Sequence, residues 1–254
     1  MNTIPTAEFY DILQKIYHIF NEKLFEGTLP NCLITVQRQK RVMGYFSSHR
    51  WVSNDGIKVH ELALNPTYFT NCNFIEVFQT MVHEMCHLWQ FEYGKSSRRS
   101  YHNKEWANKM ESIGLIPSST GAPGGKKTGQ NMNDYPQKNG LFERICIELY
   151  KNGLFVKWFD RFPEMRKANT NIVISYDDTD EDYNNTDEDI LKNLYTVVSE
   201  VLSDIIPLEE VMISAVAKQK TKYVCNGCGA AVWGRDNLNI KCNSCNIDFE
   251  IIDY

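Results

Sequence analysis

The sequence lacks the features that mark secreted or membrane-spanning proteins. No stretch approaches the roughly 18 consecutive apolar residues that a membrane-spanning helix needs, and residues 1–9 show no basic region followed by an apolar one. We therefore expect no secretory signal, no membrane partner and a cytoplasmic protein, associated with the nucleoid or lying in the host cytoplasm if its source is a virus. The chain also has no internal repeat and no glycine-rich phosphate-binding loop.

Basic residues are missing from residues 177–189, which carry eight acidic side chains. Such a block repels itself and is typical of a linker. When these eight acids are set aside, the net charge of −5 becomes +3, because 27 basic residues then face 24 acidic ones. The overall acidity therefore does not argue against a nucleic-acid partner.

What the chain does contain is His83-Glu84-Met85-Cys86-His87, within the apolar run 78–89. Apolar residues recur there at spacings of three and four, which predicts a buried helix. Because residues four apart share one helix face, His83 and His87 can bind one metal ion while Glu84 stands beside it. Zinc in such a site activates a water, with Glu84 as the general base. The alternative is a core helix whose two histidines only find hydrogen-bond partners.

A catalytic zinc site needs three protein ligands and one open position. His102 is the only histidine that follows the helix, and Glu105 and Glu111 are rival third ligands. Cys86 is less suitable, because a fourth protein ligand would close the site to water. Surface or core roles are expected for the three histidines that precede the motif, His18, His49 and His60.

Two Cys-x-x-Cys pairs near the end of the chain, 13 residues apart, supply Cys225, Cys228, Cys242 and Cys245. Four thiolates at this spacing favour one closed tetrahedral zinc site, because the segment has too little apolar content to fold unaided. The alternative is a pair of disulfides, which requires an oxidising compartment that nothing else in the sequence supports. The sequence thus predicts two zinc ions, one catalytic and one structural.

Taken together, these residues resemble the SprT-like family, which includes the Spartan DNA–protein crosslink proteases. The resemblance rests on residues 20–30, on Gly44-Tyr45-Phe46, on residues 61–66 and on the motif from His83 to His87. It implies that His102 is the third zinc ligand. The features that follow it in the family pattern are also present, namely Trp106, Ile113-Gly114 and the terminal cysteine module. The chain departs from the family at Asn103, where glycine is common.

The order of elements predicts an α+β fold, with a zincin-like metalloprotease domain whose motif helix lies beside a small mixed sheet, and a C-terminal zinc ribbon. Periodicity predicts a helix over 7–24 and strands over 33–36, 42–46 and 57–64, the last as a half-buried edge. Residues 118–140 are expected to be a long loop, either a lid or disordered. The predicted divisions are a SprT-like domain over 1–175, an acidic linker over 176–189, a helical connector over 190–219 and the ribbon over 220–254.

The resemblance further implies a DNA-dependent endopeptidase that cleaves proteins bound or crosslinked to DNA, with single-stranded DNA favoured as the partner. The candidate nucleic-acid contacts are Lys95, Arg98 and Arg99, between the metal ligands, and Trp233, Arg235 and Lys241 on the ribbon. The alternative is a non-catalytic nucleic-acid-binding or transcription-associated protein whose metals are structural. Glu84 favours the enzyme, because a structural site does not need that carboxylate.

Overall fold

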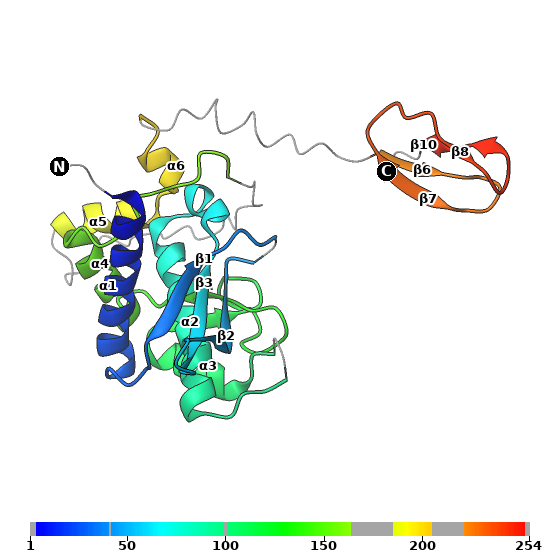
Figure 1. The fold of residues 1–254 in the computed structure, drawn as a ribbon. Helices are drawn as coiled ribbons and strands as arrows, with labels where there is room; N and C mark the ends of the chain where they lie inside the picture. Colours follow the sequence, from blue (N-terminus) through cyan, green and yellow to red (C-terminus); the bar gives the residue numbers. More distant parts are fainter. Residues whose placement is uncertain (1–3, 41, 99–100, 164–184, 205–220, 252–254) are drawn as a thin grey trace.

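A computed structural model of the chain describes residues 4–40, 42–98, 101–163, 185–204 and 221–251. These residues form a mixed α+β structure (Figure 1). Up to residue 118 the elements are α1 (Pro5–Phe25), β1 (Cys32–Val36), β2 (Gly44–Val52), β3 (Lys58–Leu64), the 3-10 helix η1 (Pro66–Asn71), α2 (Phe74–Tyr93), α3 (Lys104–Ser112) and β4 (Leu115–Ser118). They are followed by β5 (Asn133–Pro136), α4 (Leu141–Lys151), α5 (Asn185–Tyr195), α6 (Val198–Val201), β6 (Thr221–Val224), β7 (Ala231–Gly234), β8 (Lys241–Cys242), β9 (Ile247–Asp248) and β10 (Glu250–Ile251).

The first sheet has the strand order β1-β3-β2, with β1 parallel and β2 antiparallel to β3. The expectation that residues 57–64 form a half-buried edge is wrong, because β3 is the central strand and its residues 60–64 are all buried. The sequence interrupts the apolar residues of this strand with two polar residues, His60 and Glu61, but both are buried with hydrogen-bond partners. The edge strands of this sheet are therefore β1 and β2.

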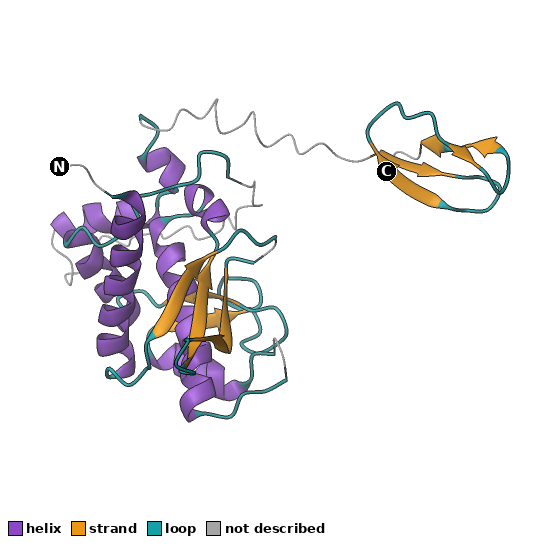
Figure 2. Ribbon diagram, viewed as in Figure 1, coloured by secondary structure: helices purple, strands orange, loops and turns teal. Residues whose placement is uncertain are grey.

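Helix α2 carries the motif and packs against this sheet, and α1 contacts both α2 and β1 (Figure 2). A capping box fixes its first turn, because Asn73 accepts from the Glu76 backbone N–H and Glu76 accepts from that of Asn73. The aromatic ring of Phe20 on α1 contacts Phe78 on α2 and Phe142 on α4, at centroid distances of 5.8 Å each. The N-terminal half of α2, which precedes His83 and His87, is thus packed in the main core.

The predicted boundary between acidic linker and helical connector, at residues 189 and 190, falls inside α5. Acidic side chains in the first turn of a helix are stabilised by its dipole, so Asp187 and Glu188 suit a helix start as well as a linker. The helix packs on α4 and α2, and its Leu191 and Leu194 are buried in the main core. The connector therefore begins as part of this core, while residues 176–184 and 205–219 lie outside the described residues.

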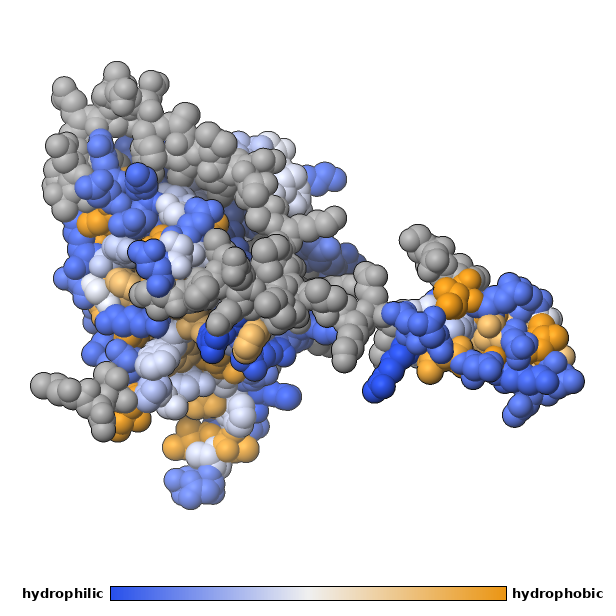
Figure 3. All heavy atoms as spheres, turned by 90° about the horizontal axis from the view of Figure 1, so that it is seen from above, coloured by the Kyte–Doolittle hydropathy of each residue, from blue (hydrophilic) through white to orange (hydrophobic). Residues whose placement is uncertain are grey.

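Three further sheets are present among the described residues. Strand β5 pairs antiparallel with β4, so the predicted loop 118–140 contains a strand near its end. Residues 221–251 form the β10-β6-β7 sheet and the β8-β9 hairpin. Apolar side chains lie exposed among polar ones on this part of the chain (Figure 3), namely Val232, Trp233, Leu238, Ile247 and Ile251. Among the helices described, none has the length and apolar character needed to cross a membrane.

Candidate functional site

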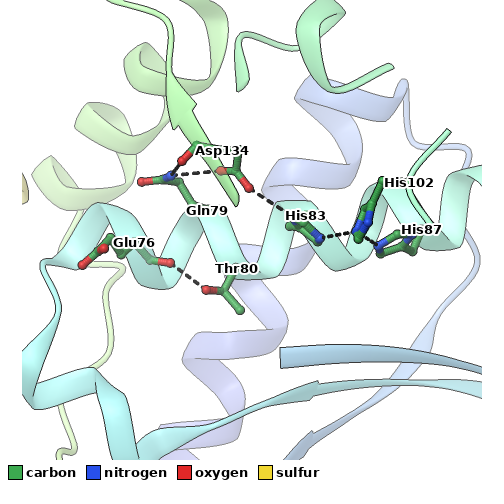
Figure 4. Close-up of polar contacts among 7 residues, drawn as sticks. All are labelled: Glu76, Gln79, Thr80, His83, His87, His102 and Asp134. Carbon is green, nitrogen blue, oxygen red and sulfur yellow. Dashed lines mark hydrogen bonds and ion pairs between the residues drawn. The ribbon is translucent and has the colours of Figure 1, made fainter. Parts of the chain in front are cut away.

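The structure brings His83, His87 and His102 together, and their ligand atoms all lie within 4.8 Å of one another. His83 and His87 are one turn apart on α2, whereas His102 lies just before α3 (Figure 4). The Nε2 atom of His102 is 3.2 Å from that of His83 and 3.1 Å from that of His87. The predicted third histidine is therefore in place.

The outer nitrogens of two of these rings are held by groups that only accept hydrogen bonds. His83 Nδ1 lies 2.9 Å from Asp134 Oδ2, and His102 Nδ1 lies 3.3 Å from the carbonyl oxygen of Gly129. A neutral imidazole that donates from Nδ1 carries its lone pair on Nε2. The close Nε2 atoms of His83 and His102 thus face each other as two acceptors, an arrangement that a shared cation stabilises.

The spacing of the cluster fits zinc. Zinc–nitrogen bonds of about 2.0–2.1 Å place two tetrahedral ligands roughly 3.4 Å apart, close to the spacings of 3.1–3.2 Å observed here. Three histidines leave one tetrahedral position open for a water or a substrate atom. A donor set of three histidines with one open position is typical of catalytic zinc sites.

The electrostatics of the cluster also favour a metal ion. Burial lowers the pKa of His87 well below its usual value and that of His102 to about 4. Burial acts in the same direction on His83, but the hydrogen bond to Asp134 and the charge of Glu84 outweigh it and leave the pKa of His83 raised. Metal ions bind the neutral imidazole. His87 and His102 are therefore kept in the metal-binding form, whereas at His83 protonation competes with metal binding.

Sequence reasoning missed Asp134, which orients His83. Its Oδ1 accepts from Gln79 Nε2 at 2.9 Å, while its Oδ2 faces His83 (Figure 4). A carboxylate behind a metal-binding histidine fixes the ring and raises its basicity. No sequence spacing marks Asp134, because it reaches α2 only through the pairing of β5 with β4.

Glu84 lies beside the three histidines and is buried. Burial raises the pKa of Glu84, and the backbone N–H of Phe46 on β2 donates to its carboxylate. Strand β2 can approach this closely because position 44 is glycine. A Cβ at Gly44 would lie 2.7 Å from Thr80 Cγ2 and 3.4 Å from Glu84 Cγ.

The rival ligands are engaged elsewhere. Glu105 Oε2 accepts from Gln90 Nε2 at 2.9 Å and from the Lys95 backbone N–H at 2.6 Å. Glu111 pairs with Lys127 on the far side of α3. The buried indole ring of Trp106 instead fills the space behind the cluster, with its centroid 4.4–5.3 Å from those of the three imidazoles.

Two hollows, of about 570 Å³ and 810 Å³, meet at the histidines. The smaller lies between the first half of α2 and residues 130–134. The larger lies between β2 and residues 96–98 and 101. Both are lined by Gly44, His83, Glu84 and His102, so together they form a cleft that passes over the metal-binding face.

The four cysteines of the terminal segment form a second cluster, with all Sγ atoms within 4.8 Å of one another. Cys228 and Cys242 Sγ are 3.7 Å apart, and zinc–sulfur bonds of about 2.3 Å would place them roughly 3.8 Å apart. Backbone N–H groups, that of Cys228 foremost, lower the pKa of Cys225 to about 7, while the Cys228 thiol raises the pKa of Cys245 to about 12. The residues fit a closed structural zinc site.

The predicted nucleic-acid contacts are scattered over the surface. Lys95 and Arg98 are exposed, and the Arg98 guanidinium lies 5.1 Å from the ring centroid of Tyr101. Arg99 lies outside the described residues. On the ribbon Trp233 is 59% exposed with Lys222 Nζ 5.8 Å from its ring, and the remaining exposed candidates are Arg235 and Lys241. Their role in binding stays a prediction.

The mixed α+β fold and the histidine cluster are consistent with a family of metallopeptidase type, which the SprT-like domain suggests. The model of the SprT-like family matches residues 13–124, which hold all three histidines and Glu84. A Salmonella typhimurium protein described as an uncharacterized protein in mucB 3'region is 53% identical over 60 residues, which cover 23% of this chain and 81% of that protein. The chain belongs to the SprT-like family, whose domain is generally zinc metalloprotease-like. No solved structure gives a significant match.

Proposed function

We propose that the chain is a zinc-dependent endopeptidase that acts on proteins bound or crosslinked to DNA. The observation that carries the peptidase part is the convergence of three imidazole Nε2 atoms beside a buried carboxylate. Zinc held by His83, His87 and His102 would supply a Lewis acid that polarises the scissile carbonyl and lowers the pKa of a water.

The proton transfers fall to Glu84. Its carboxylate accepts the proton of the attacking water and then returns it to the nitrogen of the leaving amine. Burial raises the pKa of Glu84 towards the range in which a carboxyl group can both accept and release a proton. The Phe46 backbone N–H holds the carboxylate in place, while Asp134 and Gly129 keep two imidazoles in the tautomer that presents Nε2.

The substrate is a protein chain in extended form. The outer edge of β2 borders the larger hollow, and among the described strands β2 pairs only with β3. Main-chain pairing with a free strand edge recognises peptides without demanding a particular sequence. A polypeptide paired with β2 at Gly44 to Ser47 passes beside Glu84 and the three histidines.

The DNA part of the proposal rests on the resemblance to the Spartan group and on the chemistry of the ribbon. Exposed aromatic rings beside cationic side chains suit the stacking of single-stranded bases, and Trp233 with Lys222 has this arrangement. We assign catalysis to the SprT-like domain and nucleic-acid recruitment to residues 221–251, which would fold around their own zinc ion.

The test is cleavage of a DNA-binding protein by the zinc-loaded full-length chain, with single-stranded DNA, duplex DNA or no DNA. We expect DNA-stimulated cleavage that disappears in Glu84→Gln, while Glu148→Gln, a matched change at an exposed ion pair with Lys23, retains it. A zinc-loaded chain that binds DNA and never cuts would support the non-catalytic nucleic-acid-binding alternative.

A further inference from the structure

Strand β2 has a bulge that turns its second half. Its pairing with β3 is interrupted between Ser47 and Trp51, and His49 within this stretch has a left-handed φ of 47°. Bulges near active sites re-aim side chains, and a non-glycine residue with positive φ persists only where its surroundings hold it.

The bulge is held by a buried histidine. The backbone N–H of His49 donates to Nδ1 of His60 at 3.1 Å, and Nε2 of His60 lies 3.0 Å from Glu92 Oε1 on α2. His60 is only 5% exposed. The bulge is therefore tied to the same helix that carries the metal-binding motif.

The residue that follows His49 is Arg50, and it lines the larger hollow of the cleft. Arg98, from the segment between α2 and α3, lines the same hollow. Neither guanidinium forms an ion pair within the part of the chain that the structure describes. The carboxylate of Glu61 also borders this hollow, but it is 1% exposed and already accepts from Thr35 and Gln37.

The smaller hollow has the opposite character. Its described lining contains no lysine or arginine, and besides Glu84, which lines both hollows, it includes the carboxylates of Glu76 and Asp134. The cleft is thus basic on the side of β2 and acidic on the side of residues 130–134. A peptide that crosses it meets two different electrostatic environments on the two sides of the scissile bond.

We propose that Arg50 and Arg98 form a subsite that binds the carboxylate of an aspartate or glutamate in the peptide substrate. This inference rests on the proposed peptidase function. A peptide rather than a nucleic acid is the expected ligand because the hollow runs along a free strand edge, which pairs with a polypeptide backbone. Two guanidinium groups match a carboxylate in both charge and hydrogen-bond geometry.

The test uses the zinc-loaded full-length chain and a set of quenched fluorescent peptides. The peptides differ only in having Glu, Gln or Lys at one position, placed in turn at each of four residues on either side of the cleaved bond. We expect kcat/KM to be about tenfold higher for Glu than for Lys at one position on a single side, which corresponds to one charge-assisted pair. In the double variant Arg50→Glu/Arg98→Glu, kcat/KM should instead be higher for the Lys peptide than for the Glu peptide. The matched control is Arg144→Glu, a charge reversal at an exposed position on α4 that borders neither hollow.

Equal cleavage of the Glu and Lys peptides, or a preference unchanged in the double variant, would overturn the subsite while leaving the peptidase intact. If no peptide is cut, the proposed function fails, and the subsite is judged from anisotropy of the same peptides on Glu84→Gln, with preferential binding of the Glu peptide required. A third outcome also overturns it: weaker binding of a single-stranded oligonucleotide by the double variant with no change in peptide preference would assign the arginines to nucleic acid.

Discussion

The two metal clusters of this chain are built in opposite ways. The histidine cluster takes its ligands and supports from α2, the segment before α3, and β5, and it sits against a core shared by α1, α2 and α4. The cysteine cluster takes all its ligands from residues 225–245, and in the described segment 221–251 only Tyr223, Cys225 and Cys242 are buried among the apolar residues. The first cluster is shaped by the fold around it, whereas we expect the second segment to need a bound metal ion in order to fold.

Metal removal should produce the largest difference between the two regions, in how much of each stays folded. Structural zinc in small modules contributes about 10–16 kcal/mol of apparent binding free energy, so chelation should unfold residues 221–251 and leave α2 folded. Hydrogen exchange followed by mass spectrometry measures this directly. Rapid exchange in α2 peptides after chelation, or continued protection of the ribbon, would contradict the predicted difference in metal dependence between the two regions.

Glu84→Gln should lower kcat by about 10²–10⁴-fold, the usual contribution of a general base. Bound zinc should stay at the wild-type level, because the three histidines are unchanged. The measurements are peptide cleavage and metal content of the purified protein. Loss of zinc together with activity would instead make Glu84 a structural residue of the site.

The two clusters should also differ in their response to pH. Zinc displaces protons from thiols with pKa values from about 7 at Cys225 to about 12 at Cys245, whereas at the histidine site only His83 has a raised pKa. Both affinities fall as pH falls, and between pH 8 and 7 that of the cysteine site should fall more steeply. Chelator competition on His102→Ala and on Cys228→Ser, which each retain one intact site, compares the two slopes.

Asp134→Asn should weaken zinc binding at the histidine site by about 10–100-fold, because the carboxylate that raises the basicity of His83 is replaced by a neutral amide. The ribbon site should keep its affinity and serves as the internal reference. Equal weakening at both sites would show general destabilisation and would remove Asp134 from its positioning role.

Gly44→Ala should have the smallest effect on stability and activity among these changes. The added methyl group meets Thr80 and the Ala63 carbonyl oxygen at less than 3 Å, and overpacking of this kind costs about 1–3 kcal/mol. We expect a lower Tm of the SprT-like domain and reduced kcat/KM. Gly56→Ala, at a hairpin position where a Cβ meets no atom within 4 Å but φ is positive, controls for the loss of glycine flexibility.

The local motifs of this chain were predictable because their ligands follow fixed spacings. The helix that presents His83 and His87, and the four cysteines, are set by residues three to four apart. Residues that act through tertiary pairing left no such signal, as Asp134 shows. The edge position assigned to residues 57–64 was wrong for a related reason, since His60 and Glu61 are buried by partners from other strands and from α2.

The hydrogen bonds between His102 and Gly129 couple the third histidine of the cluster to one wall of the cleft. Their backbones exchange two hydrogen bonds, of 2.8 and 3.1 Å, and the Gly129 carbonyl also faces the imidazole of His102. The residues directly after Gly129 form one wall of the smaller hollow. Because of this coupling, a bulky substrate that pushed the wall outward would be expected to draw His102 away from His83 and His87.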